Sequence, residues 1–402
     1  MSAGGFSQTR IERLRAAMAD YVDHGDPPGL VWLVARRGEI VTDFAGAMST
    51  EAGAAPIQRD TIFRISSMTK PITAVATMIL VEETRLRLDD AVDGLLPELA
   101  NRQVLKRLDG PLTDTVPASR SITVRDLLTF TPGVGLVFAD PTTHPIVQAL
   151  ADLKLGQGMP APDVPPDPDE WLRRLGTLPL MFQPGERWQY NTGADILGVL
   201  IARASGQPLE TFLRERIFEP LGMRDTGFSV PPEKLDRLPT EYYTNYATGA
   251  TDVYDPPGGQ WSHAPAFPAG SAGLVSTIDD YLAFAQMLLD NGSYAGGRIL
   301  SRPSVELMTS DQLTPAQKGP SLEDGFWNTY GWGFCMSVTT GRATIAETPG
   351  SYGWNGGLGT WWVNDPREQM ITLLMSQRAW PSATPPPLLR DFATLAYQAI
   401  DD

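Results

Sequence analysis

Two adjacent serines stand just before a lysine in an otherwise apolar stretch, Arg64-Ile65-Ser66-Ser67-Met68-Thr69-Lys70-Pro71-Ile72. On a helix, Ser67 and Lys70 occupy positions i and i+3, so they share one face and can hydrogen-bond. A serine hydroxyl is a poor nucleophile at neutral pH and needs a base beside it. An amine can be that base only if its pKa falls from about 10.4 towards about 7–8, through burial and nearby positive potential. The free N–H groups at the start of a buried helix supply such potential, and the N–H of the serine can also bind an oxyanion.

Spacing alone does not choose between Ser66, which is four residues from Lys70, and Ser67, which is three. The run from Ile72 to Glu83 has helical length and propensity, and Pro71 before it fits only in the first turn of a helix. The helix is therefore predicted to begin near one of the serines. We expect Ser66 at or before the N-cap, with its hydroxyl accepting a backbone N–H of the first turn. Ser67, one residue further in, keeps its hydroxyl free for the lysine.

Two further segments could contribute chemistry. Tyr190 ends the segment "FQPGERWQY", between a Pro-Gly turn and a helix predicted from Ala194 to Ser205 and closed by Gly206. A phenol paired with an ammonium can pass a proton to a leaving group, although a core aromatic bonded through its hydroxyl is the alternative. The glycine-rich run 350–360 can bring a strand edge close to a bound acyl group, or it can simply be a hairpin turn.

Composition restricts the class of protein. The chain has 402 residues, of which 42% are hydrophobic, and a formal net charge of −15 that would repel nucleic acid or an anionic membrane. Its one cysteine, Cys335, excludes an internal disulfide and fits plain core. His24, His144 and His263 are isolated, so we expect no metal site, and no cofactor motif is present. No apolar run reaches the ~18 residues of a membrane span, and we expect a cytoplasmic protein or one whose signal was removed.

The elements that must position these residues alternate between strands and helices. An amphipathic helix is predicted at the N-terminus, followed by a hairpin whose turn holds Gly38. Ser121 is the expected cap of a short helix, and the proline-rich, acidic run 156–169 is either a surface loop or a lid over a cleft. The remaining predictions are the hairpin strands at 29–35 and 39–45, strands at 330–338, 343–348, 359–365 and 369–377, and a final helix at about 387–400.

Strands at both ends with helices between them predict that the termini meet in one α/β lobe with a mostly helical lobe inserted. We expect residues 1–71 and 215–402 in the α/β lobe and residues 72–214 in the helical lobe. A chain of this length exceeds the ~250–300 residues of a single core, so a cleft between the lobes is expected.

Taken together, these segments resemble the superfamily of penicillin-binding proteins and class C β-lactamases, with their S-x-x-K and K-T-G motifs. The likeness covers most of the chain: "FRISSMTKPITAVATMILVEETRLRLDDAV", "ITVRDLLTFTPGV", the tyrosine region 182–228 and "PAGSAGLVSTIDDYLAFAQMLL" all have counterparts there, in the same order. The resemblance implies a β-lactamase-like fold, with a mainly antiparallel sheet flanked by helices and the active site in the cleft. It also implies Ser67 as nucleophile, Lys70 as general base and Tyr190 as second proton-transfer group, with backbone N–H groups of Ser67 and Gly357 binding the oxyanion.

The departures from that family bear on the substrate. Trp354, Asn355 and Gly356 stand where β-lactamases have Lys-Thr-Gly, which is similar to the Trp-Gly-Gly of family VIII carboxylesterases, and we expect these three residues to contact the substrate. The family lysine attracts the carboxylate of β-lactams, whereas a tryptophan offers an apolar wall. Asn191-Thr192 follows Tyr190, so the usual asparagine two places on is absent.

We therefore expect a serine carboxylesterase that hydrolyses short-chain acyl esters through an acyl-enzyme, with a small-molecule ester as partner. The oligomeric state is left open. One alternative is a peptidase, amidase or acyltransferase on the same scaffold with weak β-lactamase side activity. The other is a non-catalytic β-lactam-binding protein.

Overall fold

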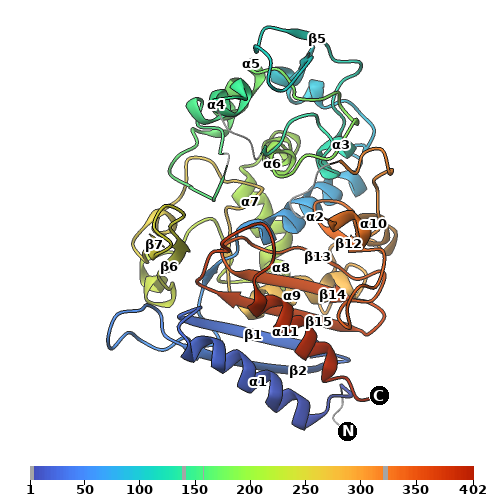
Figure 1. The fold of residues 1–402 in the computed structure, drawn as a ribbon. Helices are drawn as coiled ribbons and strands as arrows, with labels where there is room; N and C mark the ends of the chain where they lie inside the picture. Colours follow the sequence, from blue (N-terminus) through green and yellow to red (C-terminus); the bar gives the residue numbers. More distant parts are fainter. Residues whose placement is uncertain (1–3, 138–141, 157, 320–324) are drawn as a thin grey trace.

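A seven-stranded antiparallel sheet forms the base of the molecule (Figure 1). The computed structural model describes residues 4–137, 142–156, 158–319 and 325–402. The strand order is β11-β12-β13-β14-β15-β1-β2, so the first strands of the chain pair with the last. The strands are β1 (Gly29–Arg36), β2 (Glu39–Gly46), β11 (Tyr330–Trp332), β12 (Ser337–Thr339), β13 (Tyr352–Gly353), β14 (Thr360–Asp365) and β15 (Met370–Ser376).

The two ends of the chain meet on this sheet, as predicted. In the antiparallel pair of β1 and β15, Val31 lies opposite Met375. Helices α1 (Gln8–Asp23) and α11 (Pro387–Gln398) lie side by side on one face, where Leu14 and Phe392 share a core with Trp32. Helix α9 (Ile278–Leu289) covers the opposite face. Because both faces are covered, β1, β14 and β15 are buried along their whole length. β1 and β15 are mostly apolar in sequence, whereas β14 ends in the buried polar residues Asn364 and Asp365.

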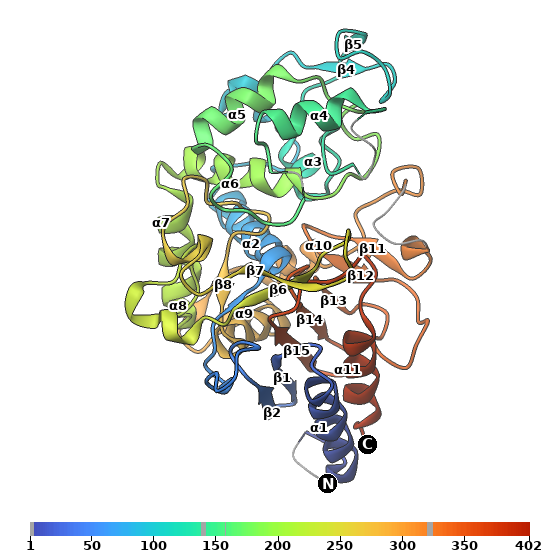
Figure 2. The same ribbon diagram turned by 60° about the vertical axis from the view of Figure 1, so that its left-hand side comes forward.

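A group of helices gathers at the other end of the molecule, with α2 running between it and the sheet (Figure 2). Their apolar faces pack on α2 and α6, whose first ten or more residues are buried. The group at that end consists of α3 (Val124–Leu128), α4 (Pro145–Asp152), α5 (Pro168–Thr177) and α6 (Thr192–Ser205). Further helices are α2 (Thr69–Glu82), α7 (Leu209–Leu213), the short helix α8 (Glu219–Leu221), which lies beside α9, and α10 (Arg302–Met308), which lies beside β12.

Four two-stranded sheets contain the remaining described strands. They pair β3 (Phe63–Arg64) with β8 (Val275–Ser276), β4 (Gln103–Leu105) with β5 (Thr115–Pro117), β6 (Glu241–Thr244) with β7 (Thr251–Asp255), and β9 (Ser293–Tyr294) with β10 (Gly297–Arg298). Strand β3, which is held by its pairing with β8, ends at Arg64, two residues before Ser66. This pairing fixes where the following helix begins.

Several local predictions are confirmed. The first hairpin turns at Gly38, whose φ of 83° suits glycine, and α6 ends at Gly206, whose φ of 73° marks a left-handed C-cap. Pro71 lies in the first turn of α2. The predicted antiparallel sheet flanked by helices is also confirmed. The division into residues 1–71, 72–214 and 215–402 stays a prediction.

Outside the serine motif, three predictions of local structure were wrong. Residues 343–348 form no strand, and the run 330–338 is broken into β11 and β12 by a tight turn in which Cys335 has a φ of 58°. The cap of α3 is Thr123 rather than Ser121: its side chain accepts the N–H of Asp126, whose carboxylate accepts the N–H of Thr123 in return. This reciprocal pair satisfies two free donors at once, which a serine two residues earlier cannot do.

In the described part of the chain, no helix is both long enough and apolar enough to cross a membrane.

Candidate active site

Ser67 lies on a single turn of 3-10 helix, η1 (Ser66–Met68), that leads directly into α2. The carbonyl of Ile65 accepts the N–H of Met68, and the carbonyls of Ser66 and Ser67 accept the N–H of Thr69. This backbone pairing places the serine at the positive end of a buried helix and at the wall of a cavity.

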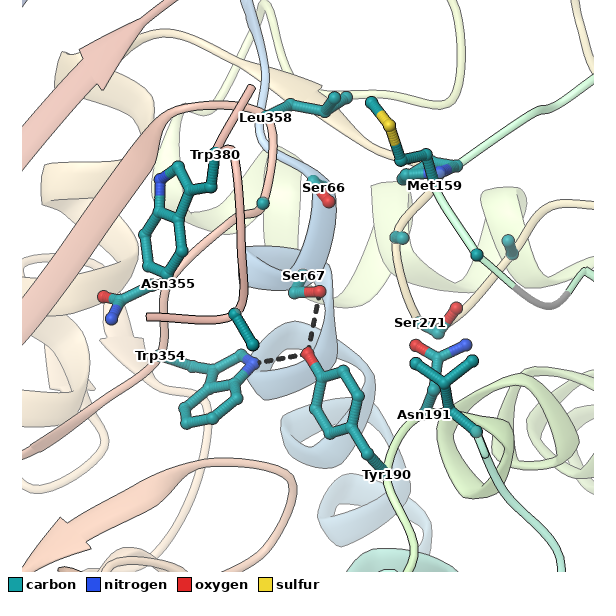
Figure 3. Close-up of a pocket in the computed structure, with 18 of the residues that line it drawn as sticks. Ser66, Ser67, Met159, Tyr190, Asn191, Ser271, Trp354, Asn355, Leu358 and Trp380 are labelled. Carbon is teal, nitrogen blue, oxygen red and sulfur yellow. Dashed lines mark hydrogen bonds between the residues drawn. The ribbon is translucent and has the colours of Figure 1, made fainter. Parts of the chain in front are cut away.

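The predicted capping role of Ser66 was wrong. No side chain caps η1 or α2, because the N–H groups of Met68 and Thr69 already pair with backbone carbonyls. Ser66 instead has a φ of 45°, a left-handed conformation that costs a non-glycine residue on the order of 1 kcal/mol. Its carbonyl accepts the hydroxyl of Thr69 at 2.7 Å, and its own side chain lines the cavity beside Ser67 (Figure 3). The strain therefore lies immediately before the candidate nucleophile.

Lys70 is completely buried, and its amine is held between two oxygen atoms. Its Nζ lies 2.9 Å from Ser67 Oγ and donates to the carbonyl of Ser271 at 2.8 Å. The amine also lies 4.5 Å from the centre of the Tyr190 ring. The i, i+3 spacing predicted from the sequence thus gives a direct serine–lysine contact.

Tyr190 reaches the same serine from the segment that precedes α6. Its hydroxyl donates to Ser67 Oγ at 2.9 Å, as the dashed line in Figure 3 shows. Phe130, Trp188 and Trp332 pack around the ring, with centroid distances of 5.9, 5.7 and 6.4 Å. An aromatic cage of this kind fixes the ring and leaves only the hydroxyl to face the cavity.

Trp354 contacts the tyrosine rather than only lining the wall. Its Nε1 donates to the hydroxyl of Tyr190 at 2.7 Å, and its ring centroid lies 4.7 Å from that of Trp332. Indole N–H is a donor only, so the hydroxyl proton of Tyr190 is left to point at Ser67. The four side chains form one chain of contacts, from Trp354 through Tyr190 to Ser67 and on to Lys70.

Residues of the glycine-rich run differ in their position relative to the cavity. Gly356 lies outside the cavity lining, and a Cβ there would come within 2.3 Å of the carbonyl oxygen of Ile65, so it lets this turn approach the serine motif. Asn355 and Gly357 do line the cavity. Gly357 accepts the N–H of Trp380 through its carbonyl, and the described residues provide no acceptor for its own N–H or for that of Ser67. Both N–H groups remain available to a ligand.

The cavity has a volume of about 1140 Å³ and mostly apolar walls. Its lining includes the serine motif, residues within 151–156 and 158–165, the start of α6, the segment 265–273, the glycine-rich run and residues within 380–394. In Figure 3, Asn191 and Ser271 lie on one side of Ser67, opposite Trp354. Residues 158–165 of the proline-rich run form part of the wall, where Asp163 pairs with His263 at 2.8 Å. The described residues at the start of this run therefore line the cavity, and whether the run acts as a lid stays open.

Sequence reasoning missed Asp195 and Ser271. Asp195 is buried on α6 and accepts the backbone N–H of Ser271 at 3.0 Å. Burial raises the pKa of this carboxyl to about 6, although the bonds from Ser271 and the charge of Lys70 act in the opposite direction. The available signal was an aspartate inside the apolar run "GADILGVLI", since a charge on the buried face of a helix needs a partner.

Among the described residues, no hydrogen bond or ion pair joins Cys335 or a histidine to Ser67, Lys70 or Tyr190. The thiol of Cys335 is buried, which raises its pKa and keeps it protonated. Among the described residues, no group of three or more histidine, cysteine, aspartate or glutamate side chains could hold a metal ion.

Comparison with known proteins places the chain in a family. Residues 14–393 match the model of the Beta-lactamase family. Protein Rv1367c of Mycobacterium tuberculosis is 40% identical over 373 residues, covering 90% of this chain and 89% of the relative. Esterase EstB of Burkholderia gladioli is 31% identical over 377 residues, covering 89% and 88%. Among solved structures, EstCE1, a hydrolase with promiscuous acyltransferase activity, superposes with a TM-score of 0.79 at 24% identity, covering 98% of this chain and 99% of that one.

The structural likeness confirms the β-lactamase-like fold, and the sequence matches confirm the family resemblance. With the serine–lysine–tyrosine contact already described, the family match identifies the class of enzyme. The chain belongs to the Beta-lactamase family and is a serine hydrolase.

Proposed function

We propose that this protein is a serine carboxylesterase that hydrolyses short-chain acyl esters of bulky, apolar alcohols. One observation carries the proposal: Ser67 Oγ lies 2.9 Å from both Lys70 Nζ and the Tyr190 hydroxyl, at the wall of a large, mostly apolar cavity. A volume of about 1140 Å³ far exceeds an acetyl or butyryl group, so most of it is available to the alcohol part.

In the proposed acylation step, Ser67 Oγ attacks the ester carbonyl while its proton moves to the amine of Lys70. The carbonyl oxygen becomes an oxyanion facing the N–H groups of Ser67 and Gly357. The bond to the alcohol oxygen then breaks, and that oxygen receives a proton through Tyr190. Water attacks the resulting acyl-enzyme by the same route in reverse, which releases the acid and restores the serine.

The names of the relatives support an ester substrate. Besides EstB, a lovastatin esterase of Penicillium rubens is 29% identical over 335 residues, covering 78% of this chain and 79% of the relative. Each name describes the relative's own activity. An ester substrate also suits Trp354, which offers no cation for the carboxylate that β-lactams carry.

We expect purified protein to turn over p-nitrophenyl acetate and butyrate and to hydrolyse penicillins slowly or not at all. The indole N–H of Trp354 already donates to Tyr190, so this position supplies neither a charge nor a free donor for a carboxylate. Initial rates on both substrate classes, measured with the same enzyme preparation, test this. Penicillin hydrolysis at a rate comparable with the esters would contradict it.

Acyl transfer to an alcohol is the second candidate function. The apolar cavity favours it, because a bound alcohol can exclude water from the acyl-enzyme. The similar Acyltransferase calJ of Penicillium decumbens, 28% identical over 367 residues, supports it by name. Turnover of p-nitrophenyl butyrate with added apolar alcohols, followed by product analysis, separates the two functions: a transferase gives mainly the new ester, and an esterase gives mainly butyrate.

A further inference from the structure

A buried carboxyl group lies behind Lys70, and the mechanism proposed above does not use it. Asp195 is 5% exposed, and its Oδ1 accepts the N–H of Ser271 at 3.0 Å. The carbonyl of the same residue, Ser271, accepts the amine of Lys70 at 2.8 Å. The backbone of Ser271 therefore links the carboxylate of Asp195 to the amine of Lys70.

Lys70 needs a counter-charge when it carries a proton. Its amine is completely buried, and its hydrogen-bond acceptors among the described residues, Ser67 Oγ and the Ser271 carbonyl, are both neutral. The ring of Tyr190 lies 4.5 Å from the amine, and the thiol of Cys335, on which the charge of Lys70 acts, is protonated, so neither supplies a negative charge. A buried cation without a nearby negative charge is strongly disfavoured. Asp195 is a carboxylic acid whose ionisation the charge of Lys70 favours.

The segment that joins the two groups is held in place from both sides. The hydroxyl of Thr73, on α2, donates to the carbonyl of Gly270 at 2.7 Å. On the α6 side, a Cβ at Gly270 would lie 2.4 Å from the carbonyl oxygen of Ala194, so only glycine fits there. The backbone of Ser271 is thus fixed between the two helices, with its carbonyl towards Lys70 and its N–H towards Asp195.

We propose that Asp195 is a positioning residue whose negative charge stabilises the ammonium that forms on Lys70 during acylation. In that step the proton leaves Ser67 Oγ and binds the lysine amine, while Asp195 gains no proton and acts through the backbone of Ser271. This inference rests on the proposed function. The alternative is that Asp195 only anchors the segment 268–274 through a hydrogen bond.

The titration of Asp195 separates these two roles. Its pKa is raised to about 6, so the carboxyl is ionised above that pH and neutral below it. The positive charge of Lys70 and the hydrogen bonds from Ser271 both lower the pKa of Asp195, against the larger effect of burial. Any effect of its charge must therefore be present at pH 8 and fade as the pH falls through about 6.

The test uses Asp195→Asn, because the amide oxygen of asparagine can still accept the N–H of Ser271 while the charge is lost. The readout is the rate at which a fluorophosphonate reagent modifies Ser67, followed by mass spectrometry. We expect this rate to fall about tenfold or more at pH 8, within the range for groups that assist proton transfer. The ratio of the wild-type labelling rate to the variant labelling rate should approach one below about pH 6, because the wild-type carboxyl is then neutral as well. Taking the ratio cancels any titration that both proteins share.

Asp280→Asn is the matched control. Asp280 is also a mostly buried acid with a raised pKa, but it accepts bonds from Asp225 and Thr226 away from the cavity, so its loss should leave the labelling rate unchanged. Equal labelling of wild type and Asp195→Asn, or a ratio that stays constant from pH 5 to pH 8, would overturn the inference and leave Asp195 as an anchor. If the wild type itself is not labelled at Ser67, the proposed function fails instead.

Discussion

Replacing Ser67 with alanine should abolish ester turnover while the protein remains folded. The substitution removes the oxygen atom that both Lys70 and Tyr190 contact, and no other hydroxyl among the described residues has both contacts. Ser67 lies on a short turn at the cavity wall, held by backbone hydrogen bonds, so an alanine fits the same conformation. We expect activity at the level of the uncatalysed reaction and a thermal unfolding midpoint close to that of the wild type.

Covalent labelling tests the same assignment directly. A phosphonylating reagent, followed by peptide mass spectrometry, should modify Ser67 in the wild type and in Ser66→Ala, and neither serine in Ser67→Ala. Ser66 is the matched control because its hydroxyl lines the same cavity without contact to Lys70. A label on Ser66 in the wild type, or turnover that survives in Ser67→Ala, would overturn the assignment and the mechanism with it.

Replacing Tyr190 with phenylalanine should lower kcat by about 10²-fold or more, the range for a general acid–base group. The ring should stay in its aromatic cage, since Phe130, Trp188 and Trp332 contact its carbon atoms. Only the hydroxyl is lost, and with it the proton path between Ser67 and the leaving oxygen. Trp354 also loses its acceptor, which costs about 1–3 kcal/mol if no water replaces it.

Steady-state kinetics on p-nitrophenyl butyrate, together with a thermal melt, measure both effects. The matched control is Tyr397→Phe on α11, which loses a buried hydroxyl bond to Asp365 outside the cavity. That control should melt at a lower temperature and keep its kcat. If Tyr190→Phe turned over esters at the wild-type rate, the tyrosine would be a core aromatic with no part in proton transfer.

Local features of the fold could be read from the sequence because short-range physics decides them. Glycine at position 38 and position 206 marks a left-handed backbone, and Pro71 fixes where a helix can begin. The i, i+3 spacing of Ser67 and Lys70 places both on one helix face whatever surrounds them. Where local signals were weak, prediction failed: the run 343–348 has apolar residues but no strand partner, and the cap of α3 depends on a reciprocal bond to Asp126.

The sequence by itself determined the family, the serine–lysine pair and the presence of a tyrosine and a glycine-rich run fit for the same chemistry. The tertiary structure decided how these parts meet. Trp354 and Tyr190 are 164 residues apart, and only the packing of the helical end against the sheet lets the indole direct the tyrosine hydroxyl towards Ser67. The link from Lys70 to Asp195 likewise passes through the backbone of Ser271, some 200 residues along the chain from the lysine. Such contacts depend on distances set by the whole fold, whereas spacing along the chain fixes only what lies within a turn or two of helix.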